Sequence, residues 1–311
     1  MTRKTRAAAT SIASNSILIV LKIIAGILTG SVSLIAEAIH SSMDLAAAVI
    51  AFFSVRVADK APDEKHPFGH GKAENISGVA EGILIFVAAA IIIYEAIQRM
   101  ISGAHLETIE IGLGIMGLSI FVNILVSRFL MKTARATDSL ALEADAKHLT
   151  TDVLTMGGVL VGLVLARITG LAIFDPITAL LVALLIIKAA IDITWKSFGG
   201  LIDTRLPLDE EQTVAMVIND HVGTLVGFHD MRTRKSGSQR FIELHLVVPH
   251  SEPLEDAHKL CDHLEEHIKG ELPNVDLQIH AEPCSAECAA CAINCADCTR
   301  PNPGEEFENR V

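Results

Sequence analysis

Long apolar stretches alternate with short polar ones over the first two thirds of the chain. An α-helix needs about 20 residues to cross the hydrocarbon core of a bilayer, and each apolar stretch has a similar length. We therefore predict six transmembrane helices, at residues 10–29, 33–57, 77–100, 109–131, 146–170 and 177–199.

The pattern changes near residue 205, where Pro207 and a run of acidic residues mark the start of a helix. From there we expect a helix, two strands, a helix and a strand, at 208–220, 227–235, 239–249, 254–270 and 274–281. In the second strand, Ile242, Leu244, Leu246 and Val248 alternate with more polar residues, which is typical of a sheet covered by helices on one side. The predicted domains are a membrane domain at 1–204, a small α+β domain at 205–283 and a Cys-rich, disordered tail at 284–311.

Composition agrees with this division. Half of the residues are hydrophobic, only 20% are charged and the mean hydropathy is +0.44, which indicates an integral membrane protein. Most of the acidic surplus behind the net charge of −12 follows residue 205, so it belongs to a soluble portion. An acidic surplus argues against nucleic acid as a partner.

Basic residues predict the orientation, because cytoplasmic loops are enriched in Lys and Arg. They gather before the first apolar stretch, between the second and third, and between the fourth and fifth, at Arg3, Lys4, Arg6, Arg56, Lys60, Lys65, Lys72, Arg128, Lys132, Arg135 and Lys147. We expect a multi-pass protein of the cytoplasmic (inner) membrane with both termini in the cytoplasm.

Two predicted membrane helices carry the same pair of ionisable residues four positions apart. His40 and Asp44 form one pair, and His148 and Asp152 form the other. Side chains four apart lie on one face of a helix, and an ionisable group at membrane depth costs at least ~2.5–3.5 kcal/mol. Histidine and aspartate are ligands of tetrahedral metal sites. The four residues therefore predict a metal site within the membrane rather than a set of polar core residues.

A second candidate site lies in the polar loop between the second and third apolar stretches. Asp63, His66 and His70 offer nitrogen and oxygen ligands, and the proline and glycines among them favour a tight backbone. A plain solvated loop is the alternative interpretation.

Three segments of the chain resemble the cation diffusion facilitator family of divalent-metal exporters. They read SVSLIAEAIHSSMD, HPFGHGKAE and ALEADAKHLTTD, and they occur in the family's order. The resemblance extends from about residue 10 to residue 283. It implies a homodimeric transporter with a six-helix membrane domain and a ferredoxin-like cytoplasmic domain that dimerises and binds regulatory metal.

The resemblance also assigns residues in the cytoplasmic part. The metal-binding positions of that domain fall on His229, His245, His258, His280 and Glu282, where some members carry Asp in place of Glu282. Lys72 and Asp203 match a charge pair that joins the third helix to the end of the sixth across the dimer.

Two histidines with two aspartates resemble the zinc-selective branch of the family. We expect Zn²⁺ to be both the exported substrate and a regulatory ligand, with protons moving inward in exchange and lipid surrounding the protein. Cd²⁺, Fe²⁺, Co²⁺ and Mn²⁺ are alternative substrates, since affinity order alone does not choose between them. Proton exchange is expected because metal ligands must be deprotonated and histidine titrates near neutral pH.

The sequence also carries features that are typical of other functions. Cys284, Cys288, Cys291, Cys295 and Cys298 crowd into the tail, where they could collect soft metal ions, act as a redox switch or be dispensable. The HLEEH segment from His263 to His267 matches a metallopeptidase signature. A membrane-anchored metal sensor or store is a third alternative. The four ligands at membrane depth, His40, Asp44, His148 and Asp152, favour a transporter, because neither a metallopeptidase nor a metal sensor requires them.

Overall fold

The computed structural model describes residues 1–29, 32–102, 110–169, 173–221 and 227–284. The chain divides into two compact units, one from Met1 to Ile202 and the other from Asp203 onward. Each unit is described separately below.

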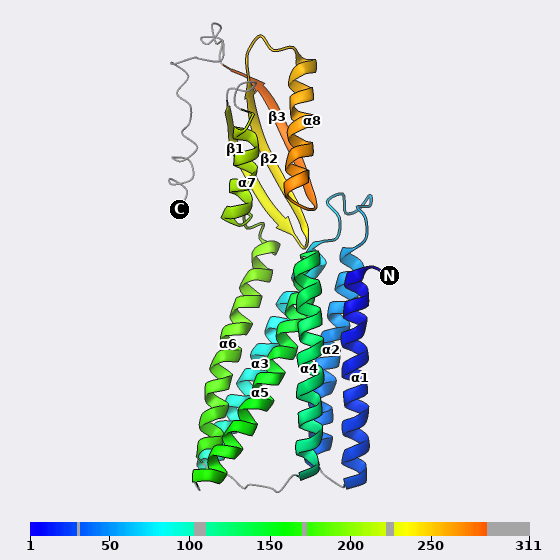
Figure 1. The fold of residues 1–311 in the computed structure, drawn as a ribbon, viewed down its shortest axis with the longest axis vertical. Coiled ribbons are helices and arrows are strands. Elements are labelled where there is room, and N and C mark those ends of the chain that lie inside the picture. The colour runs from blue at the N-terminus through cyan, green and yellow to red at the C-terminus, as the bar shows by residue number, and fades with distance from the viewer. Residues whose placement is uncertain (30–31, 103–109, 170–172, 222–226, 285–311) are drawn as a thin grey trace. The chain divides into compact units, whose positions relative to one another are not determined.

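The first unit consists of long helices that run side by side along its length (Figure 1). They are α1 (Arg3–Thr29), α2 (Val32–Ala58), α3 (Lys72–Ser102), α4 (Glu110–Thr137), α5 (Leu140–Thr169) and α6 (Phe174–Leu201). Each predicted apolar stretch falls on one of these helices, several of which extend into polar sequence. Within the described residues, four segments are long and apolar enough to span a membrane, namely Arg3–Leu28, Lys72–Gln98, Met116–Thr137 and Pro176–Leu201. The other two helices, α2 and α5, carry the predicted intramembrane ligands.

Small residues allow α3 and α6 to pack closely. A Cβ atom added at Gly82 of α3 would lie 3.2 Å from the Thr194 Cβ of α6, and one added at Gly78 would lie 3.0 Å from the Ser197 Cβ. Such close approach is how helices associate in lipid, where the hydrophobic effect does not drive them together.

One end of this unit is held by a buried carboxylate. Glu74 at the start of α3 is fully buried and accepts hydrogen bonds from Lys4 of α1, at 2.9 Å, and from the Ser139 hydroxyl, at 2.7 Å. Since Ser139 directly precedes α5, this carboxylate links three helices.

The second unit packs two helices against a three-stranded sheet (Figure 1). Its elements are α7 (Leu208–Asn219), β1 (Gly227–Ser236), β2 (Gln239–Val248), α8 (Leu254–Glu271) and β3 (Val275–Pro283). The strand order is β1-β2-β3, with β1 antiparallel and β3 parallel to β2. A parallel pair requires a crossover, which α8 provides.

The core of this unit lies between the sheet and the helices. Ile242, Leu244 and Leu246 of β2 are at most 1% exposed and belong to the same cluster as Leu264 and Ile268 of α8. The alternation predicted for this strand is therefore confirmed. The other face of the strand carries His245, which is only partly buried.

Candidate metal centre

The intramembrane cluster joins α2 to α5. His148 Nε2 lies 3.2 Å from Asp44 Oδ1. One ligand atom each from Asp44, His148 and Asp152 lies within 4.8 Å of the others. These distances would let the three side chains bind one cation. The side chain of His40 lies outside the described part of the structure; its backbone is one helical turn before Asp44 on α2.

Hydrogen bonds between helices fix the position of α5. The Ser127 hydroxyl of α4 donates to the Ala146 carbonyl of α5 at 2.8 Å. Ala146 is two residues before His148, which is itself only 5% exposed. This bond ties α5 to α4 two residues before the imidazole.

Two further acids lie near this cluster, Glu81 on α3 and Asp145 on α5. Both are fully buried, and both interact electrostatically with His148. Among the described residues, neither oxygen of Asp145 has a hydrogen-bond partner within normal distance. The sequence analysis did not single out either acid, because an acid near a predicted ligand pair carries no separate signal.

The loop between α2 and α3 brings its three predicted ligands together. Asp63 Oδ1 lies 3.0 Å from His66 Nδ1, and Asp63 Oδ2 lies 3.3 Å from His70 Nε2. Gly69 has φ +80°, a conformation that glycine adopts without strain. The backbone amides of His66 and Lys65 donate to Asp63 Oδ1. These bonds, that of His66 foremost, lower the pKa of the Asp63 carboxyl, which therefore stays charged.

A row of imidazoles crosses the sheet of the second unit. His229 on β1 pairs with His245 on β2, and His245 pairs with His280 on β3. Adjacent rings lie 5.2 and 4.9 Å apart. Glu282 lies beside this row, with Oε1 2.5 Å from His229 Nε2 and Oε2 3.5 Å from His245 Nδ1. The hydrogen bond to His229 lowers the pKa of Glu282, and the same bond raises the pKa of His229.

Asp230 joins the same cluster, although sequence reasoning missed it. Its Oδ2 lies 3.3 Å from His229 Nδ1, and ligand atoms of His229, Asp230 and His245 lie within 4.8 Å of one another. Neighbouring residues on a regular strand point to opposite faces. The register of β1 shifts just after His229, and Asp230 has a positive φ of 50°. The only available signal was an acid adjacent to a predicted ligand.

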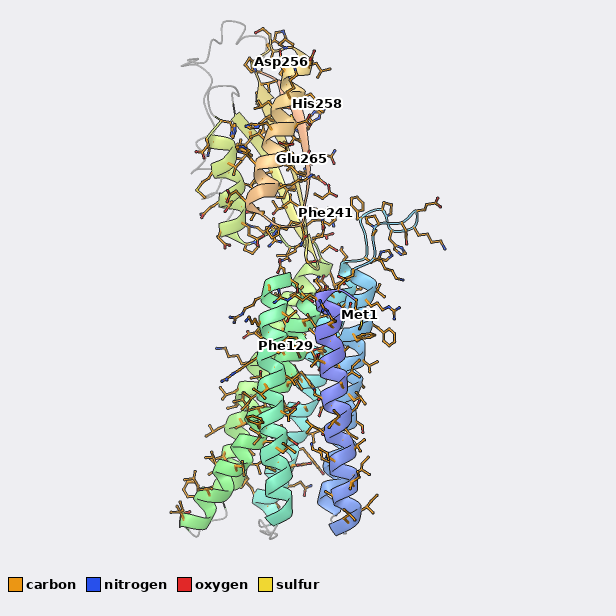
Figure 2. All side chains as sticks on the ribbon, turned by 45° about the vertical axis from the view of Figure 1, so that its right-hand side comes forward. Met1, Phe129, Phe241, Asp256, His258 and Glu265 are labelled. Carbon is orange, nitrogen blue, oxygen red and sulfur yellow. The ribbon has the colours of Figure 1, made fainter. Side chains whose placement is uncertain are left out.

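His258 is placed on α8 rather than on the sheet. Its side chain is 75% exposed, and its Nε2 lies 3.8 Å from Asp262 Oδ2 one turn along the helix. Figure 2 shows His258 on α8 with Asp256 and Glu265. Within one chain, the described contacts of His258 are therefore helical and not with the imidazole row.

The predicted charge pair also has partners within one chain. Lys72 Nζ donates to the Leu201 carbonyl at 3.3 Å, and Asp203 Oδ1 lies 3.5 Å from Arg234. Cys284 is buried, and its backbone amide donates to the Val248 carbonyl. Cys288, Cys291, Cys295 and Cys298 lie outside the described residues.

Sequence models of known families match almost the whole chain. Residues 8–202 match the cation efflux transmembrane domain, and residues 206–284 match the cytoplasmic domain of cation efflux proteins. The cation-efflux pumps FieF of Yersinia pestis (strain Pestoides F) and Yersinia pseudotuberculosis (serotype O:3, strain YPIII) are each 36% identical over 279 residues, which is 90% of this chain and 92% of theirs.

Two solved structures of related transporters each match about a quarter of this chain. The Zn form of CzrB is 36% identical and covers 26% of this chain and 92% of its own, with a TM-score of 0.25. The metal-bound C-terminal domain of the CzcD transporter from Thermotoga maritima is 26% identical and covers 24% of this chain and 88% of its own, with a TM-score of 0.24.

The two family models and the full-length relatives agree with the cluster of cation ligands between α2 and α5. The resemblance to the cation diffusion facilitator family is thereby confirmed. The chain belongs to the cation efflux family and is a multi-pass membrane transporter of metal cations rather than an enzyme.

Proposed function

We propose that this transporter exports Zn²⁺ from the cytoplasm in exchange for protons. The observation that carries the proposal is the contact between Asp44 and His148, with Asp152 in reach of the same point. With His40, which the sequence places one turn from Asp44, the site would offer two imidazoles and two carboxylates. That set suits Zn²⁺ in four-coordinate geometry.

The same ligands provide a mechanism for proton exchange. Zn²⁺ binds the neutral imidazole and the ionised carboxylates, so protons that reach them compete with the metal. His148 and His40 would exchange protons, because an imidazole titrates near neutral pH. Asp44 and Asp152 would hold the charge that attracts the cation. A proton on His148 Nε2 occupies the position that a metal would take, so the two are bound in alternation.

The remaining predicted features complete the proposal. All of α1 to α6 would cross the inner membrane, with both termini in the cytoplasm, and the unit after residue 205 would be a ferredoxin-like domain of a homodimer. Asp63, His66 and His70 would bind a second ion. The row of His229, His245, His280 and Glu282 would bind regulatory zinc, with His258 added from the predicted set. Lys72 and Asp203 would pair across the dimer, and the tail cysteines would capture metal.

Transport can be tested with purified protein in proteoliposomes that contain a metal-sensitive dye. Stopped-flow uptake of Zn²⁺, Cd²⁺, Fe²⁺ and Mn²⁺ would be compared with and without a pH gradient. We expect zinc flux that depends on the gradient and disappears in His148→Ala. The matched control is His250→Ala, which removes an exposed histidine outside the sites described above.

Three outcomes would contradict parts of the proposal. Flux of another ion in preference to zinc would change the substrate, and flux insensitive to the gradient would remove proton exchange. Tight binding without flux of any ion would support the alternative of a metal sensor or store.

A further inference from the structure

Three histidines outside the sites described so far lie together on the helical side of the second unit. His221 follows α7, while His263 and His267 are one turn apart on α8. One ligand atom from each lies within 4.8 Å of the others. The ring centroids of His221 are 5.0 and 5.2 Å from those of His263 and His267, which are themselves 4.3 Å apart.

Backbone geometry orients the first of these rings. Nδ1 of His221 lies 2.8 Å from the Val217 carbonyl oxygen. A carbonyl can only accept, so Nδ1 carries the proton and Nε2 carries the lone pair that a metal would use. Metal-binding histidines commonly have their second ring nitrogen held by a carbonyl or carboxylate in this way.

The two helices that present the histidines are fixed by the core. Leu264 and Ile268 each follow one of the α8 histidines and are at most 1% exposed. They belong to the same cluster as Val214 and Ile218 of α7. Because buried residues anchor both helices, the three imidazoles are already close, and little ordering would be needed to bind an ion.

We propose that His221, His263 and His267 form a transition-metal site that clamps the end of α7 to α8. Histidines four apart on one helical face are a known zinc-binding arrangement, and three imidazoles suit Zn²⁺, Cu²⁺ or Ni²⁺ but not Mg²⁺ or Ca²⁺. Three protein ligands leave a fourth position for water. Two of the three ligands are the histidines of the HLEEH segment, and the third, His221, follows the end of α7.

The site is separate from the imidazole row, whose members lie on β1, β2 and β3. It would let the second unit respond to cytoplasmic metal by tightening one helix pair. This inference does not rest on the transport mechanism, since it concerns binding and local stability alone.

The test uses the full-length protein in detergent, with Zn²⁺ as probe and Mg²⁺ as the negative probe. Bound zinc is measured by equilibrium dialysis and mass spectrometry in the wild type, in His263→Gln/His267→Gln and in the control His250→Gln. We expect the double variant to bind one zinc fewer per chain and the control to match the wild type. Equal stoichiometry in all three would overturn the proposal.

Hydrogen exchange then locates the ion. The free zinc concentration is set to about ten times the dissociation constant of the site. Amides that exchange only when the site opens and releases zinc should then exchange about tenfold more slowly than in zinc-free protein. We expect this slowing at residues 215–221 and 260–269 in the wild type but not in His221→Ala. The hydrogen exchange of His221→Ala without zinc shows whether its domain is folded. Slowing confined to β1, β2 and β3, or slowing that survives in a folded His221→Ala, would refute the clamp.

Discussion

Asp44 Oδ1 and His148 Nε2 lie 3.2 Å apart although the two residues are 104 positions apart in the sequence. The contact joins α2 to α5 through atoms that can hold a cation. A proton on the imidazole or a metal ion can occupy this position, but not both at once. Under the proposed exchange of metal for protons, this pair would couple the two movements.

Removing the charge of Asp44 should abolish transport. Asn has the same shape as Asp but is neutral and a weaker metal ligand. Changing a residue that only supports a metal ligand lowers activity about 10–100-fold, so we expect Asp44→Asn to lower zinc flux by more than that. Flux in proteoliposomes measures this, with Glu95→Gln on α3 as a control that neutralises an exposed acid. Wild-type flux in Asp44→Asn would exclude this carboxylate from the transport site.

The loop site should depend on the charge of Asp63 rather than on its shape. Asn at this position can still accept the amide hydrogen bonds of Lys65 and His66, so Asp63→Asn should preserve the turn while weakening zinc binding by about tenfold or more. Zinc binding would be measured in an Asp44→Asn background, with Glu64→Gln as the neighbouring control. Equal affinity in the two loop variants would show that Asp63 is not a ligand.

Features that depend on local spacing could be predicted from the sequence, whereas features that depend on long-range contacts could not. His148 and Asp152 could be placed on one face from their separation alone, and the alternation along β2 correctly assigned Leu244 to the core. The ends of the helices were harder to predict. α3 begins at Lys72, five residues before its apolar stretch, and Glu74 in its first turn is buried through Lys4, a residue 70 positions away.

Two other features depend on how separate elements meet. Asp230 reaches the imidazole row only because β1 changes register beside it. His221 meets His263 only because α7 packs against α8. The HLEEH segment showed two of these histidines but gave no indication of the third, since a sequence motif records only its own helix.

The α3 to α6 interface should not tolerate larger residues. In Gly82→Ala the added methyl would overlap Thr194 Oγ1, its nearest neighbour, and would lie 3.2 Å from Thr194 Cβ and 3.3 Å from Ile193 Cγ2. Overpacking of this kind costs about 1–3 kcal/mol, so we expect a lower thermal stability in detergent. Gly157→Ala is the matched control, because no heavy atom lies within 4 Å of its added Cβ. Thr194→Ala should partly rescue Gly82→Ala, and a fully stable single variant would contradict the packing.

In metal-free protein, the pair of His229 and Glu282 should stabilise the second unit at pH values between the lowered pKa of Glu282 and the raised pKa of His229. The raised pKa of His229 gives a contribution that is complete below its unfolded pKa of ~6.5 and is lost as pH rises through the folded value. The lowered pKa of Glu282 gives a contribution that is present above its unfolded pKa and is lost as pH falls through the folded value. For a partly exposed pair worth about 0.2–1 kcal/mol, Glu282→Gln should speed hydrogen exchange in β3 by about 1.4- to 5-fold near pH 6. This effect should fall as the pH rises through the raised pKa of His229. Hydrogen exchange of the wild type and Glu282→Gln would be compared in EDTA over this pH range. A difference between them that grows as the pH rises would show that the pair is not ionic.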